Sequence, residues 1–428
     1  MSTLPAVSSP PGTTSEADAR LFRQEVQLIL PEPDSPAASL LRRGFMACQA
    51  GVPIARSVNV PEDSPPTPYS APAPDLRLGK NVAWDEARAV FIAQKSGHVR
   101  ISRVRLEVDE TLDLPEDLDA ATGPVTFEGP VIVRRNILDM AVLKSAGTIT
   151  VYGAIEAGDV TAGGDLHVHH GICGKERGRV TAAGRLLARF LTNAQVASGG
   201  DMVIANEIAN TRLTCGGILK VERGTILGGH ATAFGGILCH TAGSDVGVKT
   251  LLEIGLAPEK YAALSQAAAI QETSLQKARD IRSVVEPLLA HAKNLTAAQK
   301  EKATELLYLA DEADTLATKA SAALEQSKEP LQACLGTSLT IIGTLHPGVL
   351  IRYPIAEAQV PTTFRGPVEI ALQCKGGSVH IVVVDRYRNT TVPLPTATST
   401  DAVADVSRRL MVGTGVGVPT HRAGASAP

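Results

Sequence analysis

The sequence predicts a mainly β protein with an α-helical insertion: a parallel β-helix followed by a long antiparallel helical hairpin. Three observations lead to this prediction. Glycines recur every 16 to 20 residues between 129 and 255, apolar residues alternate after each of them, and no glycine occurs from 256 to 335. The 428-residue chain is 44% apolar and 20% charged, which is enough apolar content for a sizeable core.

The N-terminal part of the chain is rich in proline, since 13 of the 27 prolines fall in residues 1–75. We expect a disordered start over 1–16 and a small α+β region over 17–128, which contains an extended Pro-rich linker at 61–74. Within this region, the spacing of apolar residues over 39–50 is compatible with one amphipathic helix. Residues 76–128 alternate apolar and polar side chains as short strands do.

Residues 129–256 form an internal repeat, which is the predicted β-helix. Six glycines at successive spacings of 17, 20, 16, 17 and 19 anchor the repeat: Gly147, Gly164, Gly184, Gly200, Gly217 and Gly236. Positions two and four after each anchor are almost all apolar and end with Leu238 and His240, while Thr232 stands at the inward position before the last anchor. Each repeat therefore contains short strands whose apolar side chains face inward. Units this short bury their apolar faces only by stacking on one another.

Residues 257–330 are rich in Ala, Leu, Glu, Lys and Gln and predict an antiparallel coiled-coil hairpin. The first helix has a heptad seam in which Gln271 and Arg282 are polar, which leaves room for a partner helix. Thr296 is a good N-cap for the second helix. The seam of that helix is Ala303, Leu306, Ala310, Ala313, Ala317, Ala320 and Leu324.

The chain returns to a strand-like pattern after the hairpin. Residues 337–390 are predicted to form a β segment that packs on the β-helix or caps it, because apolar residues alternate again there. Residues 396–428 are small, polar and rich in glycine, and we expect a disordered tail.

Composition excludes several classes of function. The 41 Lys and Arg and 44 Asp and Glu give a net charge of −3, and aromatic residues make up only 3% of the chain, so we expect no nucleic-acid binding. The chain has neither a signal-like start nor a run of 18 apolar residues, so we expect a cytoplasmic protein without membrane insertion. The cysteines occur without a Cys-x-x-Cys pair, which is typical of reduced structural thiols: Cys48, Cys173, Cys215, Cys239, Cys334 and Cys374.

The repeat contains one histidine cluster, His167, His169 and His170, which is a candidate metal site. The repeat register places His167 and His169 outward, and the neighbouring repeats offer no good third or fourth ligand, so the prediction is a solvated surface and no metal, cofactor or catalytic residue. Asp165, Arg185 and Asp201 occupy one position on successive repeats and predict a salt-bridge ladder about 4.8 Å apart. A polysaccharide-active enzyme would instead need paired carboxylates.

Several segments are similar to the flagellar assembly protein A (FapA) family. They include "ATGPVTFEGPVIV" at 121–133, "GTILGG" at 224–229, "LHPGVLIR" at 345–352 and, upstream, "GVPIARSV" at 51–58. The resemblance covers roughly 45–390 and consists of repeat patterns rather than of a catalytic signature. It implies a right-handed parallel β-helix that carries a coiled-coil arm, and a cytoplasmic role in organising other proteins.

These observations favour a non-enzymatic scaffold or protein-interaction module, with the hairpin as the arm that docks a protein partner. The partner's identity and the link to flagella are left open, and so are a homo-oligomer and a hairpin that acts only as a spacer. The alternatives are a β-helix enzyme, either polysaccharide-active or an acyltransferase of the hexapeptide type, and a bactofilin-like filament assembled through open β-helix ends.

Overall fold

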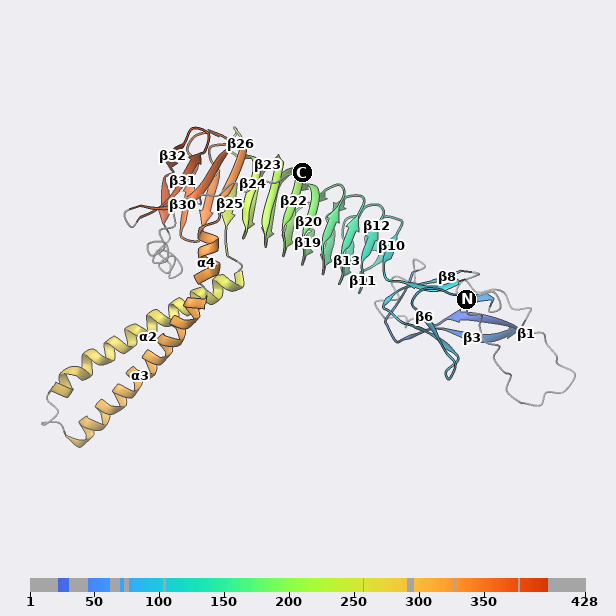
Figure 1. The fold of residues 1–428 in the computed structure, drawn as a ribbon, viewed down its shortest axis with the longest axis horizontal. Coiled ribbons are helices and arrows are strands. Elements are labelled where there is room, and N and C mark those ends of the chain that lie inside the picture. Colours follow the sequence, from blue (N-terminus) through green and yellow to red (C-terminus); the bar gives the residue numbers. More distant parts are fainter. Residues whose placement is uncertain are drawn as a thin grey trace. The chain divides into compact units, whose positions relative to one another are not determined.

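The computed structural model describes residues 22–30, 45–61, 70–72, 77–102, 105–256, 258–290, 296–326, 328–375 and 378–398 (Figure 1). Its fold is mainly strands, with a parallel β-solenoid of about eight turns and a helical region. The chain divides into two compact units, residues 1–200 and 201–428, and each is considered by itself. The start expected to be disordered, 1–16, lies outside the described residues.

Two small sheets form the N-terminal part of the first unit. The first has five strands in the order β4 (Ser70–Pro72), β1 (Phe22–Leu28), β3 (Pro53–Pro61), β7 (Val90–Ala93) and β6 (Val82–Asp85). The second has four strands in the order β2 (Met46–Cys48), β8 (Gly97–Ile101), β9 (Arg105–Asp109) and β5 (Arg77–Leu78). Apolar side chains of both sheets, among them Val26, Phe91 and Leu106, are buried in one core cluster.

The structure departs from two sequence interpretations of this region. The apolar spacing over 39–50 is compatible with a helix, but within the described residues of that stretch strand β2 pairs antiparallel with β8 at Met46 and Val99. The linker expected over 61–74 contains strand β4, which pairs with β1 at Val26 and Ala71. Pro72 is compatible with this strand because β4 lies at the edge of its sheet, where a missing backbone N–H is tolerated.

The first unit continues with solenoid coils whose strands pair in parallel. Their bounds are β10 (Leu112–Leu114), β11 (Val125–Phe127), β12 (Val131–Val133), β13 (Val142–Ser145), β14 (Ile149–Val151), β15 (Ile155–Glu156), β16 (Asp159–Ala162), β17 (Leu166–Val168), β18 (Ile172–Cys173), β19 (Arg179–Ala182), β20 (Leu186–Thr192) and β21 (Gln195–Ser198). Ile149 pairs with Leu166, and Leu166 pairs with Leu186, as the repeat predicted. Because β10 pairs with β12, the solenoid begins near Leu112 and not at 129.

The second unit contains further parallel coils: β22 (Met202–Cys215), β23 (Ile218–Ala233), β24 (Gly236–Ala242), β25 (Thr250–Ile254), β26 (Leu339–Leu345) and β27 (Leu350–Tyr353). The sequence register is off by one residue here, because Gly235 and not Gly236 stacks on Gly217, with its amide 2.8 Å from the Gly217 carbonyl oxygen. Cys239 is therefore buried, whereas His240, expected to face inward, is exposed.

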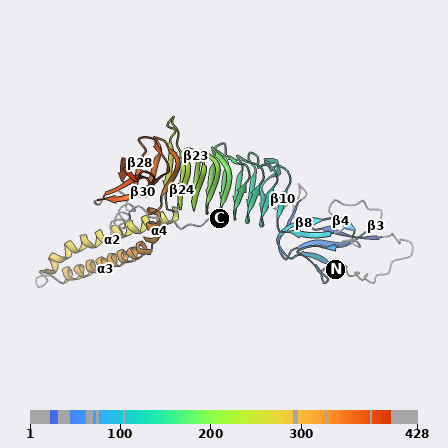
Figure 2. The same cartoon turned by 45° about the horizontal axis from the view of Figure 1, so that its top comes forward.

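The helical insertion consists of α2 (Pro258–Ala290), α3 (Ala297–Gln326) and the short α4 (Lys328–Leu335), which leads back to β26. Helices α2 and α3 run side by side in both views (Figures 1 and 2). The predicted α3 seam is confirmed, since its six buried members are Ala303, Ala310, Ala313, Ala317, Ala320 and Leu324. Thr296 caps α3: its hydroxyl oxygen accepts from the backbone amide of Gln299 at 3.4 Å, and its own backbone amide donates to the Gln299 side-chain oxygen at 2.9 Å.

The polar residues of the α2 seam bond within the hairpin. Gln271 donates to the Ser321 hydroxyl at 2.7 Å, and Arg282 pairs with Asp314. Polar residues in the seam predict room for a partner helix, but α3 already supplies the bonding partners of Gln271 and Arg282. Since partner numbers fall as α2 numbers rise, the two helices are antiparallel.

Antiparallel strands end the parallel stacking in the second unit: β28 (Ala356–Gln359), β29 (Phe364–Arg365), β30 (Val368–Lys375), β31 (Ser378–Asp385), β32 (Thr390–Pro393) and β33 (Thr396–Thr398). Strands β29 and β30 both pair antiparallel with β26, so they cover the edge of the last coil. The tail expected to be disordered over 396–428 is wrong at its start, because β33 pairs with β28. Residues beyond 398 lie outside the described part.

Candidate functional site

The histidine cluster lies on the outer surface of the first unit. His167 stands in register between Thr150 and Leu187, and its Nε2 lies 3.9 Å from the Asp165 carboxylate. His169 is exposed and stacks on Tyr152, with ring centroids 4.6 Å apart and planes 5° from parallel. The outward orientation predicted for His167 and His169 is therefore confirmed. One face of the His169 ring is therefore covered by the Tyr152 ring.

The predicted charge ladder is present between Asp165 and Arg185. Arg185 donates to Asp165 from its side chain at 3.0 Å and from its backbone amide at 2.8 Å. The backbone bond and the guanidinium hold the pKa of the Asp165 carboxyl below its usual value. In the second unit, Asp201 accepts from the backbone amide of Ile218 at 2.8 Å, so both aspartates also tie neighbouring coils together.

A second polar cluster, which the sequence did not reveal, lies on the outer surface of the second unit. Cross-strand pairing sets Thr232 beside Glu253, Glu253 beside Arg352, and Arg352 beside Glu357. His230 reaches Glu253 with Nε2 at 2.5 Å, and Arg352 donates to Glu357 from Nε at 3.2 Å. We call His230, Thr232, Glu253, Arg352 and Glu357 the outer polar cluster.

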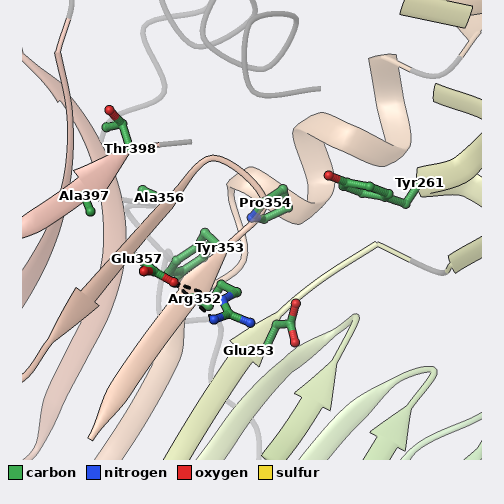
Figure 3. Close-up of a pocket in the computed structure, with 9 residues that line it drawn as sticks. All are labelled: Glu253, Tyr261, Arg352, Tyr353, Pro354, Ala356, Glu357, Ala397 and Thr398. Atoms are coloured by element: carbon green, nitrogen blue, oxygen red, sulfur yellow. Dashed lines mark hydrogen bonds and ion pairs between the residues drawn. The ribbon is translucent and has the colours of Figure 1, made fainter. Parts of the chain in front are cut away.

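A cavity of about 410 Å³ lies beside this cluster at the base of the hairpin (Figure 3). The side chain of Tyr261, from the first turns of α2, forms one side of it, and Arg352 lies between the carboxylates of Glu357 and Glu253. Thr398 of β33 closes another side. Its volume is within the range of small-molecule sites, so its chemistry decides whether it can be an active site.

Arg352 lies beside both carboxylates at the cavity: it pairs with Glu357, and its charge lowers the pKa of Glu253. The pKa of Glu253 is lowered, chiefly by the hydrogen bond from His230 and further by Thr232 and Arg352, against the opposing effect of burial. Glu253 is thus an ionised carboxylate at neutral pH. A general acid needs a raised pKa, so Glu253 is poorly suited to protonate a leaving group.

Thr232, His230 and Glu253 have the residue types of a nucleophilic triad but not its geometry. The Thr232 hydroxyl lies 3.1 Å from His230 Nε2, and the Glu253 carboxylate contacts the same nitrogen. In a triad, the nucleophile and the carboxylate bond opposite nitrogens of the ring, so that the histidine can accept the proton of one while held by the other. This arrangement is a structural network between coils.

The buried thiols and phenol near the hairpin base are also poorly suited to chemistry. Burial raises the pKa of Cys334 and of Cys239 to about 12, so both are protonated thiols rather than nucleophilic thiolates. Tyr353 donates its hydroxyl to the carbonyl oxygens of Thr337 and Ile370 at 3.1 and 3.0 Å, and burial raises its pKa. These contacts fasten the end of the insertion to the last coil.

Two further findings concern metal ions and membranes. Within the described ranges, no group of three or more His, Cys, Asp or Glu side chains is arranged to hold a metal ion. Among the same residues, no helix is long and apolar enough to cross a membrane.

Sequence reasoning missed the outer polar cluster for two reasons. The one-residue slip in the last repeat placed Thr232 inside, whereas Ala231 pairs with Leu252 in the core and Thr232 faces out. Arg352 and Glu357 follow the helical insertion in sequence, and only the pairing of β25 with β27 brings Arg352 beside Glu253.

The fold and its surfaces define a class: β-solenoid proteins with an inserted helical hairpin and a polar outer face. A family model described as "Flagellar Assembly Protein A beta solenoid domain" matches residues 110–378, which is more than half of the chain. The chain therefore belongs to the flagellar assembly protein A (FapA) family. Searches of curated proteins and of solved structures returned no significant match.

Proposed function

We propose that the chain is a non-enzymatic cytoplasmic scaffold, which organises other proteins in flagellar assembly and uses the hairpin of α2 and α3 as the arm that docks a protein partner. The observation that carries this proposal is that the hairpin is inserted between two coils without interrupting them. Strand β24 before the insertion pairs in parallel with β26 after it, and β25 pairs with β27.

The arm contributes no strand to the solenoid. At 1.5 Å per residue, the 33 residues of α2 span about 50 Å. Its base is fixed, since the Cys334 thiol lies 3.3 Å from the Gly255 carbonyl oxygen, where the chain leaves and rejoins the coils. A long element with a fixed base and no part in the core is suited to presenting a surface to another protein.

The surface chemistry supports a scaffold over the two enzyme alternatives. In the outer polar cluster Arg352 pairs with Glu357, and the carboxylate of Glu253 has a lowered pKa, whereas a glycosidase needs one carboxylic acid with a raised pKa. The acyltransferase alternative would need a catalytic histidine. His240 of the last repeat instead bonds its neighbour Thr241 and lies against Gly343.

A filament built through solenoid ends is also disfavoured at one end. Antiparallel pairing of β29 and β30 with β26 occupies the backbone groups that a further parallel coil would use.

The test is an affinity pull-down from native cytoplasm. The full chain is compared with a variant in which residues 259–329 are replaced by a short Gly-Ser loop, and circular dichroism checks that the variant keeps its β signal. We expect partners that the full chain recovers to be lost with the arm, and each such partner to bind the purified full chain directly.

Recovery of the same partners by both proteins would move docking to the solenoid or the N-terminal sheets, and recovery of none by either would overturn the scaffold proposal.

A further inference from the structure

Inward-facing residues fill more than one row on each helix, since Ala268 on α2 and Ala313 and Ala320 on α3 are buried beside a row that repeats every seven residues. On α2 this row runs through Leu264, Gln271, Ala278 and Val285, of which Gln271 is part-buried and the others are buried. On α3 the corresponding row is buried throughout and consists of Ala303, Ala310, Ala317 and Leu324. Seven residues are two turns of a coiled coil, so the members of each row lie on one side of their helix, and the two rows face each other across the hairpin.

The rows on either side of the inward rows differ in chemistry. Residues that directly precede the inward rows are mostly apolar: Ala263, Ile270, Lys277 and Val284 on α2, and Lys302, Leu309, Leu316 and Ala323 on α3. Residues that directly follow these two rows are all polar, although the exposed Leu307 lies beside them on α3: Ser265, Glu272, Arg279 and Glu286 on α2, and Thr304, Asp311, Thr318 and Glu325 on α3. We call the first set the apolar flank and the second set the polar flank.

The two halves of the apolar flank lie on the same side of the hairpin. Each half is displaced by one residue, about 100°, in the same sense from its own inward row. Because α2 and α3 are antiparallel, the same rotation on both helices leads to the same side. The flank is open: Ile270, Val284 and Leu316 are 40%, 56% and 46% exposed.

We propose that the apolar flank packs against the apolar flank of a second copy of this chain and forms a four-helix bundle. This inference rests on the proposed function, in which the hairpin is the docking surface, and it names the occupant. The bundle places α2 of one copy antiparallel to α3 of the other, as within each hairpin.

The size of the flank meets the needs of a stable dimer. Ala263 to Val284 spans about 32 Å, and two packed helices are about 20 Å wide. The flank would therefore cover about 640 Å² per copy, or about 1,300 Å² in total, within the range of specific interfaces.

The flank is also complementary to itself under a two-fold axis that runs along the arm. The bonds of Gln271 to Ser321 and of Arg282 to Asp314 show which residues of α2 and α3 lie at the same height along one hairpin. Interpolating between these two pairs, the flank residue of α3 nearest in height to Ile270 is Ala323. In the dimer, the large Ile270 of one copy therefore faces the small Ala323 of the other.

Two remaining features favour the same face. By the same interpolation, Lys277 meets Leu316 of the second copy, where its aliphatic stem can pack while its ammonium reaches water. The polar flank instead carries a net negative charge, from Glu272, Glu286, Asp311 and Glu325 against Arg279 alone, so two polar flanks would repel.

The test measures the mass of the purified full chain in solution at a concentration that favours association. We expect twice the 44.7 kDa of one chain. Val284→Glu with Leu316→Glu places charges in the apolar flank and should weaken self-association at least about tenfold. The matched control, Ser265→Glu with Thr318→Glu, adds the same charge to the polar flank and should leave association unchanged. Circular dichroism checks that both keep their helices.

A further variant, Lys277→Leu, removes the one charge from the middle of the flank and should tighten the dimer several-fold. The inference would be overturned by any of three results: the wild-type chain stays a single copy, the dimer survives the flank substitutions, or Lys277→Leu has no effect on the dimer. If the chain is a single copy while arm-dependent partners are still recovered from cytoplasm, the proposed function stands and the flank serves a different protein.

Discussion

Replacing Leu166 by alanine tests the stacked core of the solenoid. Leu166 is fully buried and stands in register between Ile149 and Leu186 of the adjacent coils. Backbone bonds of 2.9 and 2.8 Å fix the spacing of these coils, so the neighbouring side chains have little freedom to close the cavity. We expect a loss of about 3–5 kcal/mol, the upper part of the range for such substitutions.

The adjacent residue provides the control. His167 lies on the outer face of the same strand, so His167→Ala should cost less than about 1 kcal/mol. Native-state hydrogen exchange is the suitable assay, because solenoids open coil by coil and one global transition would average over the coils. Amides of β14, β17 and β20 should lose protection in the Leu166 variant only. Equal losses in both variants, or a larger loss for His167→Ala, would refute the assigned register.

Two other substitutions test specific contacts. Gly171→Ala would place a methyl group about 2.5 Å from the Phe190 ring, so we expect a loss of about 1–3 kcal/mol by urea unfolding that vanishes in a Phe190→Ala background; a loss that persists there would contradict the contact. Glu253→Gln should cost about 1–3 kcal/mol at neutral pH. Because the folded pKa of Glu253 is lowered, its stabilisation is present above the usual value of 4.5 and is lost as pH falls below it, so the melting temperatures of wild type and variant should converge in acid. A constant difference would argue against the ionised pair.

The parallel coils could be predicted because their cause is local. A glycine at each corner and apolar residues at fixed distances from it determine which side chains face inward, and Ile149, Leu166 and Leu186 stack as expected. The prediction slipped by one residue where two glycines stand together. Periodicity alone does not distinguish Gly235 from Gly236, and the choice is made by the bond from Gly235 to Gly217 in the previous coil.

The outer polar cluster and the N-terminal sheets could not be predicted, because both depend on long-range pairing. Glu253 meets Arg352 only after the hairpin has returned the chain to the solenoid. In the N-terminal part, β4 is too short and too rich in proline to be recognised as a strand, and its pairing with β1 defines it. Local propensity carries little information where a distant strand decides the structure.

The hairpin shows how a correct seam can support an incorrect inference. Gln271 and Arg282 looked like gaps in a two-helix core, yet Ser321 and Asp314 satisfy them inside the hairpin. A partner therefore finds both of these side chains already bonded, and association must draw its free energy from apolar area elsewhere. Beside the seam, the flank with Ile270, Val284 and Leu316 offers more such area than the side with Leu307, so the residues next to the seam, and not those within it, should decide what the arm binds.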